Sequence, residues 1–157
     1  MESDEKWMRA ALHEAAKAAA NGEVPVGAVA VQDNRIIARG HNVREATCNP
    51  LGHAELLLVQ KLSKKLRAWR LSGVTLYVTL EPCLMCMGAL LQARIDRLVF
   101  ATFDPKAGAC GSLFDLSQDK RLNHRIPVTA GVLKAEASQM LSEFFRNLRK
   151  LKSQLRQ

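Results

Sequence analysis

Two short motifs constrain this chain more than any other feature of its sequence. His53-Ala54-Glu55 offers an imidazole and a carboxylate, and Pro82-Cys83-Leu84-Met85-Cys86 offers two thiols at the i, i+3 spacing, which places both thiols on one face of a helical turn. One histidine and two cysteines form a ligand set that suits Zn²⁺. Three protein ligands leave a coordination position open, which is typical of a catalytic zinc site. The motifs therefore predict zinc-assisted hydrolysis, with Glu55 near the metal but not bound to it.

A closed, structural zinc site is the alternative interpretation of the same motifs. Cys48 or Cys110 could supply a fourth ligand, and such a site would hold no water and would have no use for Glu55. Three features argue against it: Glu55 lies beside a ligand, Glu81-Pro82 abuts the first cysteine of the pair, and neither spare cysteine belongs to a second Cys-x-x-Cys motif.

Length and composition predict one cytoplasmic domain. The 157 residues suffice for a single core, and no apolar run approaches the roughly 18 residues of a membrane span. The acidic, polar start of the chain is unlike a signal peptide, and four cysteines are too few for a disulfide scaffold. The net charge of +8 favours a polyanionic partner such as nucleic acid, although charge also serves solubility. Basic residues concentrate at 61–70 and 146–156.

Apolar periodicity predicts a three-layer α/β/α fold. The patterns indicate helices at 4–20, 53–66, 84–94 and 134–149, and strands at 24–31, 36–38, 74–80, 98–102 and 127–132. Their order implies right-handed crossovers and a mixed, largely parallel sheet of about five strands. We expect one domain over residues 1–150 and a frayed basic tail at 151–157. The expected buried faces of two helices comprise Leu56, Val59, Leu62 and Leu66, and then Ala137, Leu141, Phe144 or Phe145, and Leu148.

The metal motifs resemble the signature of the zinc-dependent nucleoside and nucleobase deaminases, the cytidine-deaminase-like superfamily. Further motifs make the chain similar to the bacterial tRNA-specific adenosine deaminases; they lie at 22–28, 76–83, 111–113, 123–125 and 144–146. The resemblance implies one Zn²⁺ per subunit, held by His53, Cys83 and Cys86. It also implies attack of zinc hydroxide on adenine C6, with Glu55 as proton shuttle. By the same resemblance, the substrate is the wobble adenosine in the anticodon stem-loop of an arginine tRNA, and the enzyme is a homodimer.

Five further residues are candidates for substrate binding. Asn42 offers a donor and an acceptor to the edge of a flipped base, or else caps a loop. Asp104 and Lys106 follow a predicted strand and would hold the RNA backbone, unless they belong to an ordinary surface loop. Phe145 and Arg149 are one helical turn apart, so Phe145 would stack on a base and Arg149 would contact a phosphate. The alternative for Phe145 is a place in the core beside Phe144.

Two rival functions remain at this point. The first is a deaminase of free guanine, cytosine or cytidine, which would have no need of a basic tail. The second is an RNA-binding module with a structural zinc, which would bind tRNA without releasing ammonia.

Overall fold

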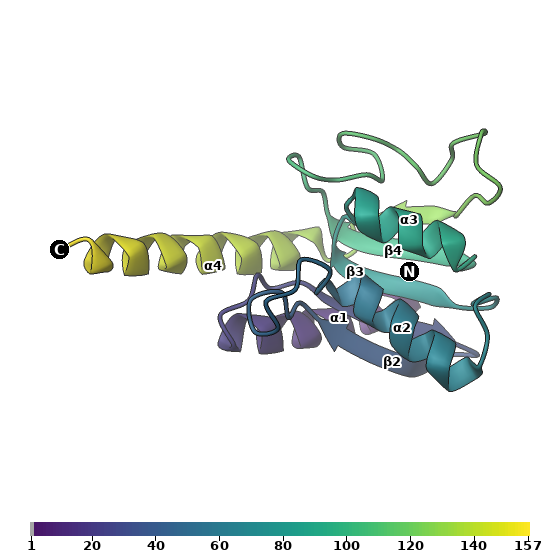
Figure 1. The fold of residues 1–157 in the computed structure, drawn as a ribbon, viewed down its shortest axis with the longest axis horizontal. Helices are drawn as coiled ribbons and strands as arrows, with labels where there is room; N and C mark the ends of the chain where they lie inside the picture. Colours follow the sequence, from purple (N-terminus) through teal and green to yellow (C-terminus); the bar gives the residue numbers. More distant parts are fainter. Residues whose placement is uncertain (1) are drawn as a thin grey trace.

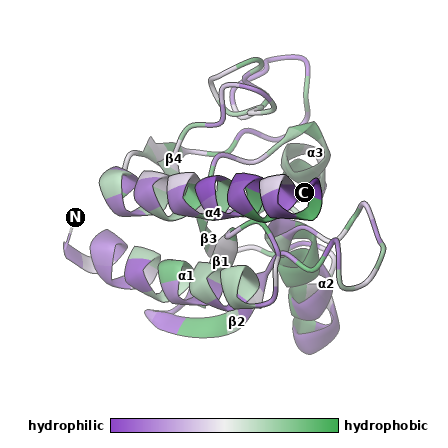
Figure 2. Cartoon of the chain, turned by 90° about the vertical axis from the view of Figure 1, so that its left-hand side faces the viewer, coloured by the Kyte–Doolittle hydropathy of each residue, from purple (hydrophilic) through white to green (hydrophobic). Residues whose placement is uncertain are grey.

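The computed structural model describes residues 2–157, and in that part of the chain four helices enclose a five-stranded sheet (Figure 1). Helices α1 and α4 cover one face of the sheet, and α2 and α3 cover the other (Figure 2). The predicted three-layer α/β/α fold is therefore confirmed. The elements follow in the order α1 (Glu2–Ala20), β1 (Gly27–Gln32), β2 (Arg35–His41), α2 (Ala54–Leu66), β3 (Thr75–Leu80), α3 (Leu84–Gln92), β4 (Arg97–Thr102), β5 (Val128–Ala130) and α4 (Lys134–Leu155).

The sheet is mixed, with strand order β2-β1-β3-β4-β5. Strand β1 is antiparallel to both of its neighbours, β2 and β3, whereas β3, β4 and β5 run parallel. The β1–β2 hairpin forms because Asp33 and Asn34 both adopt positive φ, at 50° and 60°, the combination that a tight type I′ turn requires. Parallel pairing is thus confined to the half of the sheet whose strands are joined by longer crossovers.

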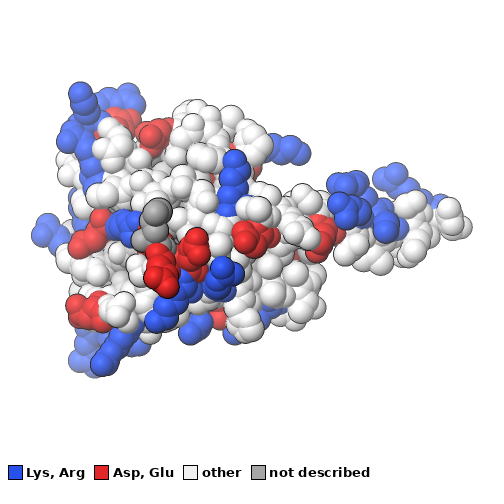
Figure 3. All heavy atoms as spheres, turned by 180° about the vertical axis from the view of Figure 1, so that it is seen from behind, with Lys and Arg blue, Asp and Glu red and all other residues white. Residues whose placement is uncertain are grey.

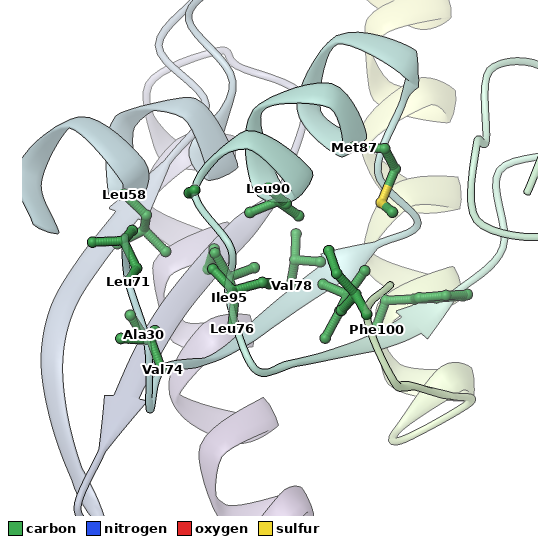
Figure 4. Close-up of a cluster of buried hydrophobic side chains, with 14 of the residues drawn as sticks. Ala30, Leu58, Leu71, Val74, Leu76, Val78, Met87, Leu90, Ile95 and Phe100 are labelled. Atoms are coloured by element: carbon green, nitrogen blue, oxygen red, sulfur yellow. The ribbon is translucent and has the colours of Figure 1, made fainter. Parts of the chain in front are cut away.

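The larger core lies between the sheet and the helices α2 and α3 (Figure 4). It includes Leu58, Leu76 and Phe100, all fully buried. The predicted buried stripe of α2 is only partly right, because Leu62 is buried while Leu56, Val59 and Leu66 are half-buried. The stripe that faces the sheet is instead Ala54, Leu58 and Leu62, spaced one helical turn apart.

On the other face, α1 packs so closely on β1 that a side chain would not fit between them. A Cβ at Gly27 would overlap the backbone of Ala11 and Ala15. The first strand therefore begins with a glycine because α1 lies directly against its backbone.

Helix α4 is longer and less buried than its sequence pattern indicates. The predicted end at residue 149 is wrong: the helix continues to Leu155, through the segment expected to be frayed. Only Ala137 of this helix is buried, and its far end projects from the body of the molecule (Figure 1). Leu151 and Leu155 are 57% and 87% exposed. Lys and Arg side chains gather on this projecting end (Figure 3).

The predicted buried side of α4 is therefore largely absent, because the sheet ends before the helix does. Leu141, Phe144 and Leu148 are half-buried and Phe145 is exposed.

Within residues 2–157, none of the helices combines the length and the apolar character needed to cross a membrane.

A buried polar network attaches the start of α1 to the sheet. Asp4 accepts two hydrogen bonds from Arg97, at 2.9 and 2.8 Å, and one from the hydroxyl of Tyr77 at 2.8 Å. The hydrogen bond from Arg97 holds the pKa of the Asp4 carboxyl below its ordinary value. Burial and the hydrogen bond to Asp4 raise the pKa of Tyr77 to about 12. The network joins α1, β3 and β4 at the edge of the smaller core.

The isosteric substitution Asp4→Asn removes the charge that pairs with Arg97 and should lower the free energy of unfolding at neutral pH by about 1–2 kcal/mol. The loss is modest because Arg97 is one-third exposed, so that solvent screens the ion pair. The melting temperature should fall by about 2–8 °C. Since the pKa of Asp4 is lowered in the folded state, its pairing stabilises the fold above the ordinary pKa of 3.8, and the benefit is lost as the pH falls through the lower, folded-state value. Denaturant unfolding of the parent protein and of Asp4→Asn from pH 7 to pH 2.5 measures the difference in their free energies of unfolding. A difference that does not shrink in acid contradicts the prediction.

Candidate metal centre and active-site pocket

The candidate metal ligands lie where α2 and α3 begin. His53 is the N-cap residue of α2, and Cys83 is the N-cap residue of α3; both have extended backbone dihedrals. The His53 side chain makes no capping hydrogen bond. Instead, Oδ1 of Asn42 accepts the N–H of Ala54 at 3.0 Å and satisfies the start of the helix from outside. The imidazole of His53 is thereby left to act as a ligand.

The three predicted ligand atoms meet at the spacing that a tetrahedral zinc ion requires. Nδ1 of His53 lies 3.7 Å from Sγ of Cys83 and 3.5 Å from Sγ of Cys86, and all three atoms lie within 4.8 Å of one another. Zinc–nitrogen and zinc–sulfur bonds of about 2.0 and 2.3 Å at tetrahedral angles place nitrogen and sulfur about 3.6 Å apart. The donor set and its geometry therefore fit a zinc ion.

The spare cysteines do not join this cluster. Among the residues that the structure describes, the group able to hold a metal consists of His53, Cys83 and Cys86. Cys48 is exposed, and its thiol donates to the carbonyl of Glu45 at 3.7 Å. Cys110 is buried, and burial raises the pKa of its thiol to about 12. The geometry thus favours the three-ligand site over the closed, four-ligand alternative.

Hydrogen bonds within the cluster shift the pKa values of the three candidate ligands in different directions. Hydrogen bonds from Cys86 and then from His53 lower the pKa of the Cys83 thiol to about 4. The hydrogen bond to Cys83 raises the pKa of the His53 imidazole, whereas the hydrogen bond to Cys83 and burial raise the pKa of Cys86. The position of Cys83 at a helix N-terminus adds to the stabilisation of a thiolate. The cluster therefore already favours one anionic sulfur facing an imidazole.

Glu55 lies in the first turn of α2, beside the ligand cluster. Its side chain is buried, at 4% exposure, and it lines the same pocket as His53 and Cys83. Burial raises the pKa of the Glu55 carboxyl above its usual range, because loss of hydration disfavours the carboxylate, and the charge of His53 offsets only part of this effect. The position of this carboxyl beside the ligand cluster suits a group that takes up and releases a proton during a reaction.

The pocket next to the cluster has a volume of 770 Å³, and α4 supplies part of its lining. Its lining includes six of the residues that the sequence singled out: Asn42, His53, Glu55, Cys83, Asp104 and Phe145. Cys86 is buried behind this lining. Lys106 and Arg149 are exposed and do not line the pocket. The contacts of these residues with a substrate stay predictions.

The predicted RNA-contacting residues of the long loop and of α4 have specific local surroundings. Oδ1 of Asp104 accepts the N–H groups of Lys106 and Ala107 at 3.0 and 3.2 Å, so Asp104 also shapes its own loop. Phe145 is 40% exposed and packs edge-on against Phe144, with ring centroids 5.5 Å apart. Phe145 is therefore not a core residue, and its ring is accessible from the pocket.

Several lining residues were not predicted to form part of a substrate site: Glu23, Arg44, Glu81, Phe144, Leu148 and Lys152. Glu81 is the most highly connected of them. Its carboxylate accepts the N–H groups of Asp104, Cys110 and Ser112 at 2.9–3.0 Å, together with the hydroxyl of Ser112. Burial acts to raise the pKa of Glu81, but these hydrogen bonds outweigh it and hold the pKa below its ordinary value. The only sequence signal for this role was the place of Glu81 directly before Pro82-Cys83.

The family model and the known protein that match this chain are both of deaminases. The model of the MafB19-like deaminase family matches residues 2–149. The chain is 51% identical over 156 residues to the tRNA-specific adenosine deaminase of Bacillus subtilis, covering 99% of this chain and 97% of that protein.

Solved structures of deaminases are also similar to this chain. A structure from biochemical and structural studies of A-to-I editing by tRNA:A34 deaminases at the wobble position of transfer RNA matches with a TM-score of 0.83 and 39% identity, over 87% of this chain and 99% of that chain. The guanine deaminase from Nitrosomonas europaea matches less well, with a TM-score of 0.73 and 27% identity over 89% and 83% of the two chains.

Zinc added to the metal-free protein should raise its melting temperature by about 5–10 °C at one hundred times the dissociation constant, because the ion binds the folded state only. The variant His53→Ala should lose most of this shift, whereas Cys48→Ser should keep it, since the thiol of Cys48 lies outside the cluster. Differential scanning fluorimetry with zinc titration makes the measurement. A shift that survives His53→Ala, or one that Cys48→Ser abolishes, contradicts the three-ligand site.

Proposed function

The chain belongs to the MafB19-like deaminase family, and from this premise we propose that it converts the wobble adenosine of a tRNA anticodon to inosine, with release of ammonia. The proposal draws its substrate from the tRNA-specific adenosine deaminase of Bacillus subtilis, to which the chain is similar along nearly its whole length. The similar structure from studies of A-to-I editing by tRNA:A34 deaminases supports the same substrate.

One structural observation carries the chemistry. The buried carboxyl of Glu55 lies beside a His–Cys–Cys cluster of zinc geometry, in a pocket large enough for a nucleoside. A zinc ion held by His53, Cys83 and Cys86 would supply a Lewis acid that makes water a nucleophile at neutral pH. A structural zinc module would have no use for a buried carboxyl at this place.

Glu55 is proposed to move the protons of the reaction. Its carboxylate takes one proton from the attacking water and passes it to the ring nitrogen N1 of adenine. It then takes the proton of the new hydroxyl on C6 and gives it to the departing amino group, so that C6 becomes a carbonyl. Water adds to C6, the bond from C6 to the amino nitrogen breaks, and the products are inosine and ammonia. The burial of Glu55 suits this role, because the low polarity of its surroundings lets it hold a proton between steps.

The remaining pocket residues are proposed to hold the flipped base and its neighbours. Because Oδ1 of Asn42 accepts the N–H of Ala54, its amide group is fixed and its nitrogen can donate to the base edge. Phe145 would stack on a neighbouring base of the loop, and Lys106 and Arg149 would contact phosphates near the pocket mouth. Asp104 would act through the turn that it stabilises.

The rival of a free-base deaminase has weaker support. The similarity to the guanine deaminase is 27% in identity, against 39% and 51% for the two tRNA-related matches. The basic end of α4 also fits a polyanionic substrate better than a small base.

Finer features of the proposal rest on family resemblance. They are the choice of an arginine tRNA, a homodimeric assembly with one zinc per subunit, and a cytoplasmic location beside the tRNA pool. Residues 1–150 are proposed to form a single domain.

The substitution Glu55→Gln should lower kcat on tRNA by about 10²–10⁴-fold, because an amide cannot shuttle protons, while zinc content stays near one ion per chain. Elemental analysis gives the zinc content, and nucleoside analysis of a digested total tRNA pool gives the inosine. Glu5→Gln, at an exposed position on α1, is the matched control. Loss of folding in the variant, or release of ammonia from free guanine or cytidine but not from tRNA, contradicts the proposal.

Phe145→Ala should raise the KM for an anticodon stem-loop by about 5–150-fold, which corresponds to the about 1–3 kcal/mol of a base stacked on an aromatic ring. Steady-state kinetics on the stem-loop test this. Leu155→Ala serves as control, because Leu155 is an apolar residue of the same helix that lies outside the pocket and is 87% exposed. Equal KM values for Phe145→Ala and the parent protein would rule out the stacking role.

A further inference from the structure

The pocket of this basic protein contains carboxylates that the proposed reaction does not use. Besides Glu55, both Glu23 and Glu81 line it, at 2% exposure each. A buried carboxylate needs hydrogen-bond donors to offset the loss of hydration, and next to an anionic substrate it would repel what the pocket is meant to bind. Some other interaction must therefore account for these two residues.

Both carboxylate oxygens of Glu23 bind the backbone of one loop. Oε1 accepts the N–H of Glu45 at 2.9 Å, and Oε2 accepts the N–H of Ala46 at 2.7 Å. Hydrogen bonds of backbone N–H groups to a carboxylate are roughly twice as strong as those between neutral groups. They attach the loop between β2 and α2 to the end of α1.

The loop that Glu23 holds has few other attachments. The remaining hydrogen bonds of residues 43–49 are local: they join these residues to one another, as from Asn49 to Arg44, or to the adjacent Leu51 and Gly52. Among the residues that the structure describes, only Glu23 hydrogen-bonds this segment from outside the stretch 42–52. The same loop carries Arg44, a cationic residue of the pocket lining.

The opposite wall of the pocket is built in the same way. Glu81 accepts three N–H groups and one hydroxyl from the loop after β4, which carries Asp104. A Cβ at Gly108 would overlap the Glu81 carboxylate, so this loop packs directly on that carboxylate. Each wall therefore rests on one buried carboxylate whose oxygens are taken up by backbone donors.

We infer that Glu23 is a positioning residue for RNA recognition: it fixes the loop at 43–49 so that Arg44 faces the substrate, as Glu81 fixes the opposite wall. This inference rests on the proposed function. Glu23 touches neither the ligand cluster nor Glu55, so its effect should fall on substrate binding and leave the chemical step intact.

The experiment compares Glu23→Gln with Glu45→Gln. Both remove one negative charge from the same wall, but Glu45 contributes its side chain only to an exposed pair with Arg44, whereas Glu23 holds the loop backbone. Simple electrostatics predicts tighter RNA binding for both variants. The positioning role predicts the opposite sign for Glu23→Gln.

For Glu23→Gln we expect the KM and the dissociation constant for an anticodon stem-loop to rise about tenfold at constant salt, with kcat within about threefold of the parent. For Glu45→Gln both constants should stay the same or fall. Glu23→Ala, which removes both acceptors, should bind more weakly still. Fluorescence anisotropy measures the dissociation constant. Hydrogen exchange should show faster exchange of the amides at 43–49 in Glu23→Gln than in the parent protein, and this readout does not depend on activity.

Three results overturn the inference: unchanged exchange at 43–49, RNA binding by Glu23→Gln as tight as that of the parent, or a fall in kcat with KM unchanged. A parent protein that binds the stem-loop but makes no inosine contradicts the proposed function alone. A parent protein that binds no RNA contradicts both.

Discussion

The site depends on three loops leaving the sheet at the same edge. Strand β1 is antiparallel to both β2 and β3, so two reversals of direction cancel and β2 points the same way as β3; β4 is parallel to β3. The chain after each of these strands therefore emerges at one edge, where α2 and α3 both begin. Helix N-termini carry positive partial charge, and their convergence favours the thiolate and carboxylate groups that a metal centre needs.

This arrangement explains why the ligands could be predicted from the sequence while the walls of the pocket could not. His53 with Glu55, and Cys83 with Cys86, are each close in sequence, so their spacing alone places them on one helical turn. The apolar pattern likewise predicted the helices, the strands and the α/β/α layers, because periodicity is a local property. Glu23 is different, since its role rests on contact with residues more than twenty positions away. No spacing rule reports such a contact.

The errors made from the sequence have a related cause. The buried stripe of α2 is displaced from the predicted one because the sheet and α3 together decide which side is covered. The end of α4 was misplaced because a helical pattern does not reveal where the supporting sheet stops. The hydrogen bond from Ala54 to Asn42 at the start of α2 was likewise missed, whereas the contact of Asn42 with a base stays a prediction. In each case tertiary contacts, absent from a local pattern, decided the outcome.

The charged residues that line the pocket are also brought together by tertiary contacts. The buried carboxylates of Glu23 and Glu81 are hydrogen-bonded to backbone donors, which offset the cost of burying their charge. Arg44 and Lys152 stand at the pocket lining, and further basic residues follow along the projecting end of α4 (Figure 3). Most of the stability of a helix in a protein comes from the packing of its apolar face. Because Leu151 and Leu155 are exposed, the last turns of α4 gain little from such packing, and contacts nearer its start, such as the burial of Ala137, hold the helix on the sheet.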